Sequence, residues 1–224
     1  MKTVQRHDSK LENLWVIIKF AYYFLALPCL AVLSVAMAFI AYGSAVGKTT
    51  GADSQFYSVA FVVWLLTAVP LILRRYAKVT RRRQLKKMVA LLTSDKRFCP
   101  LKQHQVMDAG QGKYLGIDIK FGNILYIHMV KKGVVDVIGL TMRDWTEREL
   151  EDGTLRINTK NPEVPVLSIN AHPTVTRELF NTLGAMSHNS YVESFPQEPW
   201  PLHVSIQSRF VEFEHDVVVP QASN

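Results

Sequence analysis

Two long apolar stretches dominate the first third of the chain. Residues 20–42 form a run of 23 positions without a charged side chain, which extends back to residue 14 if one lysine is allowed. A second uncharged run of 18 positions covers residues 56–73. With a rise of about 1.5 Å per residue, helices of these lengths can cross the ~30 Å hydrocarbon core of a bilayer. The pattern predicts a transmembrane helical hairpin over residues 14–73, with spans at about 14–42 and 56–73.

The pattern changes after residue 113, where short segments alternate between apolar and polar positions. Such alternation indicates β-strands with one buried face, and the dipeptide Gly122-Asn123 is typical of a tight turn between two of them. The expected strands are 114–121, 124–130, 134–142, 155–159 and 164–169. Many short strands joined by tight turns favour a mostly antiparallel sheet or a small barrel.

One helix is expected to close this β domain. Thr174 is a suitable N-cap, and four apolar residues follow it at helical spacing: Val175, Leu179, Leu183 and Met186. We therefore predict an α+β membrane protein. A two-helix transmembrane hairpin is followed by a small, mostly antiparallel β domain over residues 103–190, closed by its C-terminal helix.

The last segment, residues 191–224, has a different pattern. Three prolines within residues 195–201 indicate a stiff, extended linker or an extended peptide that lies over the domain. Beyond it, residues 202–213 are expected to form one or two extra strands, because Val211 and Phe213 alternate with glutamates.

Charge is distributed unevenly along the chain. It has 26 Lys and Arg against 19 Asp and Glu, a formal net charge of +7. Residues 1–102 hold 16 basic and 4 acidic side chains, whereas residues 103–224 hold 10 basic and 15 acidic. The positive excess therefore belongs to the hairpin and to residues 74–102, for which we predict a basic juxtamembrane helix.

This basic segment predicts the topology of the hairpin. The positive-inside rule places it, together with the N-terminal residues 1–13, on the cytoplasmic side of the membrane. Both termini are then cytoplasmic, and membrane lipids are a predicted partner because each Lys or Arg near an anionic surface contributes about 1 kcal/mol. The predicted membrane-surface and topology residues are Arg74, Arg75, Lys78, Arg81, Arg82, Arg83, Lys86 and Lys87.

The basic and apolar segments allow two other interpretations. A cleaved signal peptide would use Lys2, Arg6 and Lys10 as its basic region and residues 36–38 as its cleavage site. The apolar run continues past that site and a second span follows, which disfavours cleavage. The basic run could also contact nucleic-acid phosphates, but only Tyr76 is interleaved with it, so we expect no nucleic-acid partner.

Motifs for catalysis or metal binding are absent from the sequence. Cys29 and Cys99 form no C-x-x-C pair, and the seven histidines show no metal-ligand spacing. Residues 43–49 (GSAVGKT) lack the first glycine of a phosphate-binding loop. The carboxylates between Asp144 and Asp152 are interpreted as a charged loop between strands. We predict no enzymatic activity, no catalytic or metal-binding residues and no cofactor.

Two resemblances give these elements a context. The order of strands followed by one helix, with Trp145 before an acidic turn and RELFNTLGAM as the closing helix, resembles bacterial pleckstrin-homology-like domains. Such domains are generally binding modules. The hairpin beginning LENLWVIIKFAYYFLALPCL, the following RRYAKVTRRRQLKK and the small C-terminal domain resemble the ExcA entry-exclusion (surface-exclusion) proteins of IncI-type conjugative plasmids.

The second resemblance implies a protein of the bacterial inner (cytoplasmic) membrane that blocks redundant conjugative DNA transfer into a cell already carrying the plasmid. It also implies recognition of TraY, a membrane component of the donor's conjugation apparatus. With a cytoplasmic domain, either the donor component reaches into the recipient or the positive-inside interpretation misplaces the domain. A generic membrane-tethered adaptor is the alternative function, an unrecognised lipid- or cell-wall-modifying enzyme is a third, and homo-oligomerisation is left open.

Overall fold

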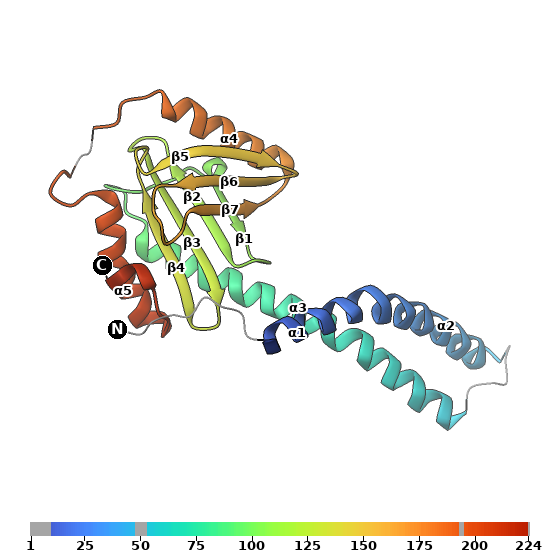
Figure 1. Cartoon of the computed structure of the whole chain (residues 1–224). Coiled ribbons are helices and arrows are strands. Elements are labelled where there is room, and N and C mark those ends of the chain that lie inside the picture. The colour runs from blue at the N-terminus through green and yellow to red at the C-terminus, as the bar shows by residue number, and fades with distance from the viewer. Residues whose placement is uncertain (1–9, 48–52, 193–194, 224) are drawn as a thin grey trace. The chain divides into compact units, whose positions relative to one another are not determined.

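The computed structural model describes residues 10–47, 53–192 and 195–223. It confirms an α+β chain in which two long apolar helical stretches near the N-terminus precede two antiparallel sheets (Figure 1). The chain divides into two units, Met1–Ala77 and Lys78–Asn224. The predicted boundary at residue 103 therefore falls inside the second unit.

The first unit is built from helices. Helix α1 (Lys10–Ala21) continues through a π-helical turn (Tyr22–Ala26) into α2 (Leu27–Ala45). The wider π turn lies directly before Pro28, whose ring would clash with the carbonyl of an ordinary preceding turn. The structure thus shows the local geometry that accommodates this proline.

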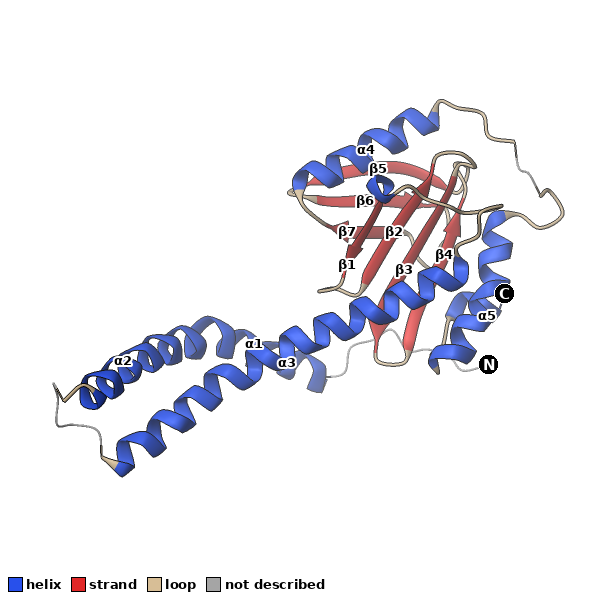
Figure 2. Ribbon diagram, turned by 180° about the vertical axis from the view of Figure 1, so that it is seen from behind, coloured by secondary structure: helices blue, strands red, loops and turns tan. Residues whose placement is uncertain are grey.

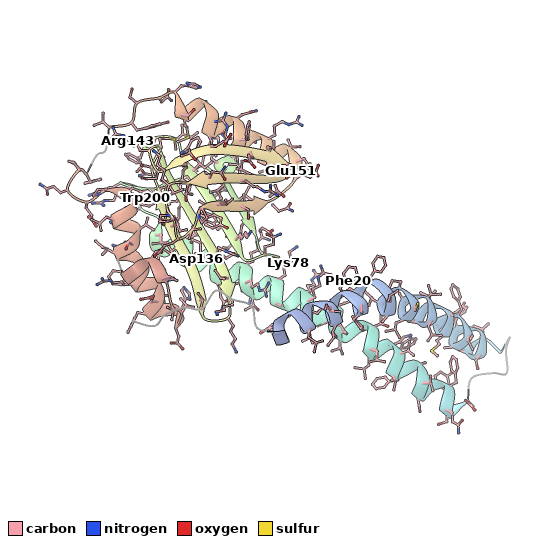
Figure 3. The ribbon with its side chains drawn as sticks, viewed as in Figure 1. Phe20, Lys78, Asp136, Arg143, Glu151 and Trp200 are labelled. Atoms are coloured by element: carbon pink, nitrogen blue, oxygen red, sulfur yellow. The ribbon has the colours of Figure 1, made fainter. Side chains whose placement is uncertain are left out.

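Two polar side chains join the helices of this unit. The Tyr22 hydroxyl donates to the Leu66 carbonyl over 2.6 Å, and the Trp64 indole donates to the Ser34 carbonyl over 3.2 Å. Both acceptors are backbone oxygens inside helices, so these bonds fix how the two helices of the hairpin face each other. Most of the surrounding apolar side chains, among them Phe20 and Phe39, are exposed on the outside of the unit (Figure 3).

Helix α3 (Ser54–Leu92) is longer than the predicted second span, because it includes the basic segment as well. It ends at Leu92, so the predicted juxtamembrane helix is too long: residues 93–101 are not helical, and Lys102 begins a short 3-10 turn. Its last turns bury Leu85 and Met88 at 0% and 1% exposure. These residues belong to the core of the second unit, whereas the basic segment was expected to lie outside any domain.

The second unit contains a four-stranded and a three-stranded sheet, both antiparallel throughout. The first has the order β1 (Gln105–Asp108), β2 (Lys113–Asp118), β3 (Asn123–Lys131), β4 (Val134–Leu140). The second has the order β5 (Trp145–Glu151), β6 (Thr154–Thr159), β7 (Val166–Asn170). Helix α4 (Pro173–Ser187) follows, so the predicted sheet and closing helix are present with seven strands in place of about five.

One core lies between the two sheets and under α4. Its members come from alternate positions of the strands and from one face of the helix: Val106, Leu115, Ile117, Ile124, Tyr126, Ile138, Leu140, Trp145, Leu155, Ile157, Leu167, Ile169, Leu179, Leu183 and Met186. The predicted helical stripe is thus confirmed, with Val175 partly buried against it. The N-cap is His172, whose Nδ1 accepts from the backbone N–H of the predicted cap, Thr174.

A second core lies on the other face of the first sheet, which the sequence does not predict. The end of α3 and helix α5 (Trp200–His215) cover that face (Figure 2). Their buried residues pack on strand positions opposite to those of the first core: Tyr114, Leu125, Ile127, Val135 and Val137. Strand β4 is consequently buried at all seven positions, which explains its almost continuous apolar sequence.

Two predicted elements are wrong. Residues 202–213 form the helix α5 instead of strands, because Val204, Ser208 and Val211 recur at helical spacing and are buried on the first sheet. The predicted charged loop between Asp144 and Asp152 is mostly the strand β5. Its glutamates point outward from an edge strand, where charged side chains oppose pairing with another chain.

Candidate interaction surfaces

The eight predicted topology residues all lie exposed on α3, on either side of the unit boundary. Two of them have partners within their own unit. The guanidinium of Arg74 stacks over the Tyr23 ring at 5.1 Å, and Arg81 donates to the Gly110 carbonyl in the β1–β2 turn over 2.9 Å. Arg81 therefore holds α3 to the β domain, a structural role that the sequence does not indicate. The contribution of all eight to membrane topology stays a prediction.

Helix α5 presents an apolar face to the outside of the second unit. Its inner face is fixed by Trp200, whose ring stacks on Phe98 at 5.1 Å between centroids and whose indole donates to the Ile124 carbonyl over 2.9 Å. The outer residues recur at i, i+4, i+8 and i+11, and their exposed fractions are large: Leu202 43%, Ile206 41%, Phe210 60% and Phe213 92%. We call these four residues the α5 stripe. A soluble helix seldom exposes such a continuous apolar row unless it serves an interaction.

A groove of about 440 Å³ lies between three separate segments of the second unit, and we call it the turn groove. It is lined by residues 121–123 before and at the start of β3, residues 141–143 between β4 and β5, residue 187 at the end of α4, and residues 189–192 after that helix. Gly122 has φ +70° and lies under the Tyr191 ring, so close that a Cβ atom would be 2.6 Å from it. Glycine is thus required at this turn on both conformational and packing grounds.

The turn groove is held in shape by two aspartates. Buried Asp118 accepts from the backbone N–H groups of Lys120 and Cys99, at 2.9 and 2.8 Å. Asp144 accepts from the N–H and hydroxyl of Thr141, at 2.7 and 2.6 Å. Both carboxylates therefore act as turn-forming acceptors. For Asp144, these hydrogen bonds fit the structural role that the sequence predicts for the carboxylates between Asp144 and Asp152.

A smaller recess adjoins the turn groove and shares Phe121 and Asn123 with it. In the recess, Glu198 accepts from Arg97 over 2.8 Å and contacts Nδ1 of His203 at 2.9 Å. The hydrogen bond with His203, together with the charge of Arg97, lowers the pKa of the Glu198 carboxyl. This carboxylate is therefore already satisfied by its own unit.

Three ionisable residues sit side by side across the first sheet. Lys113 on β2 is paired with His128 on β3, which is paired with Asp136 on β4. The Lys113 amine donates to the Ser168 hydroxyl of β7 over 2.8 Å, and the side-chain amide of Gln221 donates to Asp136 over 3.2 Å. Burial, followed by the nearby Lys113 charge, lowers the pKa of the His128 imidazole, while Asp136 opposes this effect.

The lowered pKa of His128 predicts a loss of stability in weak acid. As the pH drops below the ordinary pKa of 6.5, His128 takes up a proton in the unfolded chain before it does so in the folded chain. The free energy of unfolding therefore decreases as the pH is lowered. Between pH 7 and pH 5, we expect His128→Gln to reduce the slope of the unfolding free energy against pH, by at most the value that corresponds to one bound proton. Urea midpoints at pH 5, 6 and 7 measure this. Exposed His188→Gln is the control, and an unchanged slope in His128→Gln would contradict the prediction.

Other candidate residues from the sequence are not brought together. Lys48 and Thr49 of the loop resembling a phosphate-binding motif lie outside the described residues. Within the described ranges, no group of three His, Cys, Asp or Glu side chains could hold a metal ion. The residues of the α5 stripe recur at helical spacing in the sequence, a signal that could have predicted this helix. The alternation of Val211 and Phe213 with glutamates favoured a strand instead. The turn groove left no sequence signal, because its three walls are far apart in the chain.

The comparisons with known proteins add one positive finding. The family model described as "Exclusion-determining protein" matches residues 1–222. No curated protein and no solved structure matches the chain. The family match covers the helical hairpin and the whole second unit, and it supports a role in entry or surface exclusion. The chain therefore belongs to the Exclusion-determining protein family.

Proposed function

We propose that this protein is a non-enzymatic entry-exclusion factor of the bacterial inner membrane, akin to the ExcA proteins of IncI-type plasmids. It blocks redundant conjugative DNA transfer into a cell that already carries the plasmid, by protein–protein recognition. The observation that carries this proposal is the family match over residues 1–222. A TraY-like membrane component of the donor's conjugation apparatus is the partner that the sequence resemblance implies.

Insertion of the first unit in the membrane is supported by its surface. Two helical stretches, Ile17–Ala45 and Ser54–Leu92, are long and apolar enough to cross a bilayer. Within them, residues 20–42 and 56–73 carry no charged side chain, and large apolar side chains such as Phe24 and Phe61 are 68% and 62% exposed. A helix of this kind is stable only inside a large core or in lipid. The basic half of α3 supports a cytoplasmic second unit.

The second unit supports a binding role. Sheets of four and three antiparallel strands closed by α4 fit the proposed pleckstrin-homology-like domain. The second core adds a layer that carries the α5 stripe. We propose this stripe as a contact surface for the transfer-apparatus protein, because two phenylalanines on it are among the most exposed apolar side chains of the unit.

The test is a mating experiment with recipients that express this protein alone. We expect transfer of a matching plasmid to fall by at least tenfold relative to recipients with an empty vector, and the double variant Phe210→Ser, Phe213→Ser to restore most of it. Because both residues are exposed, the variant should accumulate in membranes at the normal level, which an immunoblot checks. The topology is tested in the same cells with a fluorescent protein fused to the C-terminus, of a kind that fluoresces only in the cytoplasm.

Unchanged transfer into cells that express the wild-type protein would overturn the proposed function. Pull-down from these cells separates it from the alternative adaptor role. Capture of a host complex, with no transfer-apparatus protein from mating mixtures, would favour the adaptor.

A further inference from the structure

We propose that the turn groove binds a short anionic segment of a partner protein in an extended conformation. The inference rests on the proposed function, because it names the chemistry of the protein segment that exclusion would recognise. It concerns a different surface from the α5 stripe. Trp200, which begins α5, lines the smaller recess that adjoins the groove, and Figure 3 shows Arg143 and Trp200 on the same side of the second unit.

Charge gives the groove its sign. No carboxylate is among the described residues that line it, whereas Arg143 is exposed there. The guanidinium of Arg143 has no hydrogen-bond or ion-pair partner within the described part of the chain; its backbone N–H donates to the Thr141 hydroxyl, and its backbone carbonyl accepts from Lys160. Exposed Lys96 lines the adjoining recess, and exposed Lys120 lies over the Phe121 ring. The carboxylate of Glu198, which also lines the recess, is paired with Arg97. A free guanidinium in such a setting favours a carboxylate.

The remaining lining suits a peptide better than a small ion. The side chains of Asn189 and Ser190 have no partner among the described residues, so they can bond the N–H and C=O groups of an extended chain. The rings and thioether of Phe121, Met142 and Tyr191 provide an apolar floor for one or two side chains. The volume of about 440 Å³ lies within the usual range for ligand sites.

A peptide that alternates acidic and apolar residues fits both parts of this lining. Alternate side chains of an extended segment point to opposite sides, so its carboxylates can meet Arg143 while its apolar side chains lie on the floor. A small anion such as phosphate would use Arg143 alone and would gain nothing from the apolar floor.

The experiment uses the full chain in nanodiscs of phosphatidylcholine, with empty nanodiscs as blanks. The probes are two fluorescein-labelled decapeptides, one alternating Glu and Leu and the other alternating Lys and Leu, measured by fluorescence anisotropy. The variant Arg143→Glu is compared with Arg177→Glu, which reverses an exposed arginine near the start of α4, at the opposite end of that helix from the groove.

We expect the Glu–Leu peptide to bind the wild-type chain and Arg177→Glu equally, and to bind Arg143→Glu at least tenfold more weakly. The Lys–Leu peptide should bind only Arg143→Glu. Equal binding of both peptides to the wild type, or no effect of Arg143→Glu, overturns the inference. Displacement of the Glu–Leu peptide by 10 mM inorganic phosphate, but not by NaCl of equal ionic strength, also overturns it in favour of a small anion.

Mating assays with the same variants keep this test separate from that of the proposed function. If recipients that express the wild-type protein and recipients that express Arg143→Glu exclude the plasmid equally well, the groove proposal fails while the proposed function stands. If recipients that express the wild-type protein do not exclude the plasmid, the proposed function fails. The anisotropy measurements then still decide whether the groove binds an acidic peptide.

Discussion

A chain that begins at residue 103 will not fold into the domain that the structure shows, although the sequence pattern places the domain boundary there. This truncation removes Leu85, Met88, Leu92 and Phe98, which are 0–3% exposed in the second core. Each buried side chain of this size contributes about 1.5–3 kcal/mol, so their loss removes roughly 6–12 kcal/mol. A domain's net stability is only about 5–15 kcal/mol, so the shortened domain should be largely unfolded.

The loss also removes part of the cover over the strand residues of the second core. Leu125 and Ile127 of β3 and Val135 and Val137 of β4 are 0–1% exposed, and in the shortened chain α5 would have to cover this face without α3. An apolar face that is left partly uncovered promotes aggregation as well as unfolding. The matched control is the chain Lys78–Asn224, which retains the end of α3 and corresponds to the second unit.

Circular dichroism and urea titration of the two purified fragments measure this effect. The Lys78–Asn224 fragment should show a cooperative unfolding transition, whereas the fragment that begins at residue 103 should show none or should precipitate. Equal midpoints for the two fragments would contradict the assignment of α3 to the core of the second unit.

Trp200→Ala should destabilise the second unit by about 3–5 kcal/mol, the usual range for removing a large buried aromatic side chain. Trp200 is 3% exposed, stacks on Phe98 and donates its indole N–H to the Ile124 carbonyl. Together these contacts fasten the start of α5 to β3. Trp200→Phe keeps a ring for the stack but loses the hydrogen bond, for which about 1 kcal/mol is expected on top of the change in packing.

Urea unfolding followed by far-ultraviolet circular dichroism compares the three proteins. The expected order of midpoints is wild type, then Trp200→Phe, then Trp200→Ala. Phe213→Ala serves as the surface control, because that side chain is 92% exposed and its removal should change stability little. If Trp200→Ala were no less stable than Phe213→Ala, α5 would not be fastened through this residue.

Local patterns in the sequence predicted elements that depend on local physics. The two apolar runs predicted two long helical stretches, because uninterrupted apolar sequence of that length satisfies its own backbone only as a helix in lipid. Gly122-Asn123 predicted the turn between β2 and β3, since glycine adopts the positive φ that the turn needs. The stripe of Leu179, Leu183 and Met186 predicted α4 in the same way.

Local patterns failed where a segment is apolar on both sides or where a regular strand carries many charges. Helix α5 is apolar on its inner and outer faces, which hides the helical period and left Val211 and Phe213 looking like a strand. In β5 the glutamates hid the inward positions, of which Trp145 is buried and Arg148 stacks on Phe180 at 4.4 Å.

The sequence by itself determined the two-part organisation of this protein: an apolar helical hairpin, a basic segment and an acidic domain of strands with one closing helix. Only the tertiary structure decided that the basic segment ends in the core of that domain, that α5 covers the same sheet, and that Arg143 faces a groove built from three distant segments. The physical reason is the separation along the sequence between the residues that interact. Helix and strand periods are set within about ten residues, whereas cores and grooves form from residues that folding brings together.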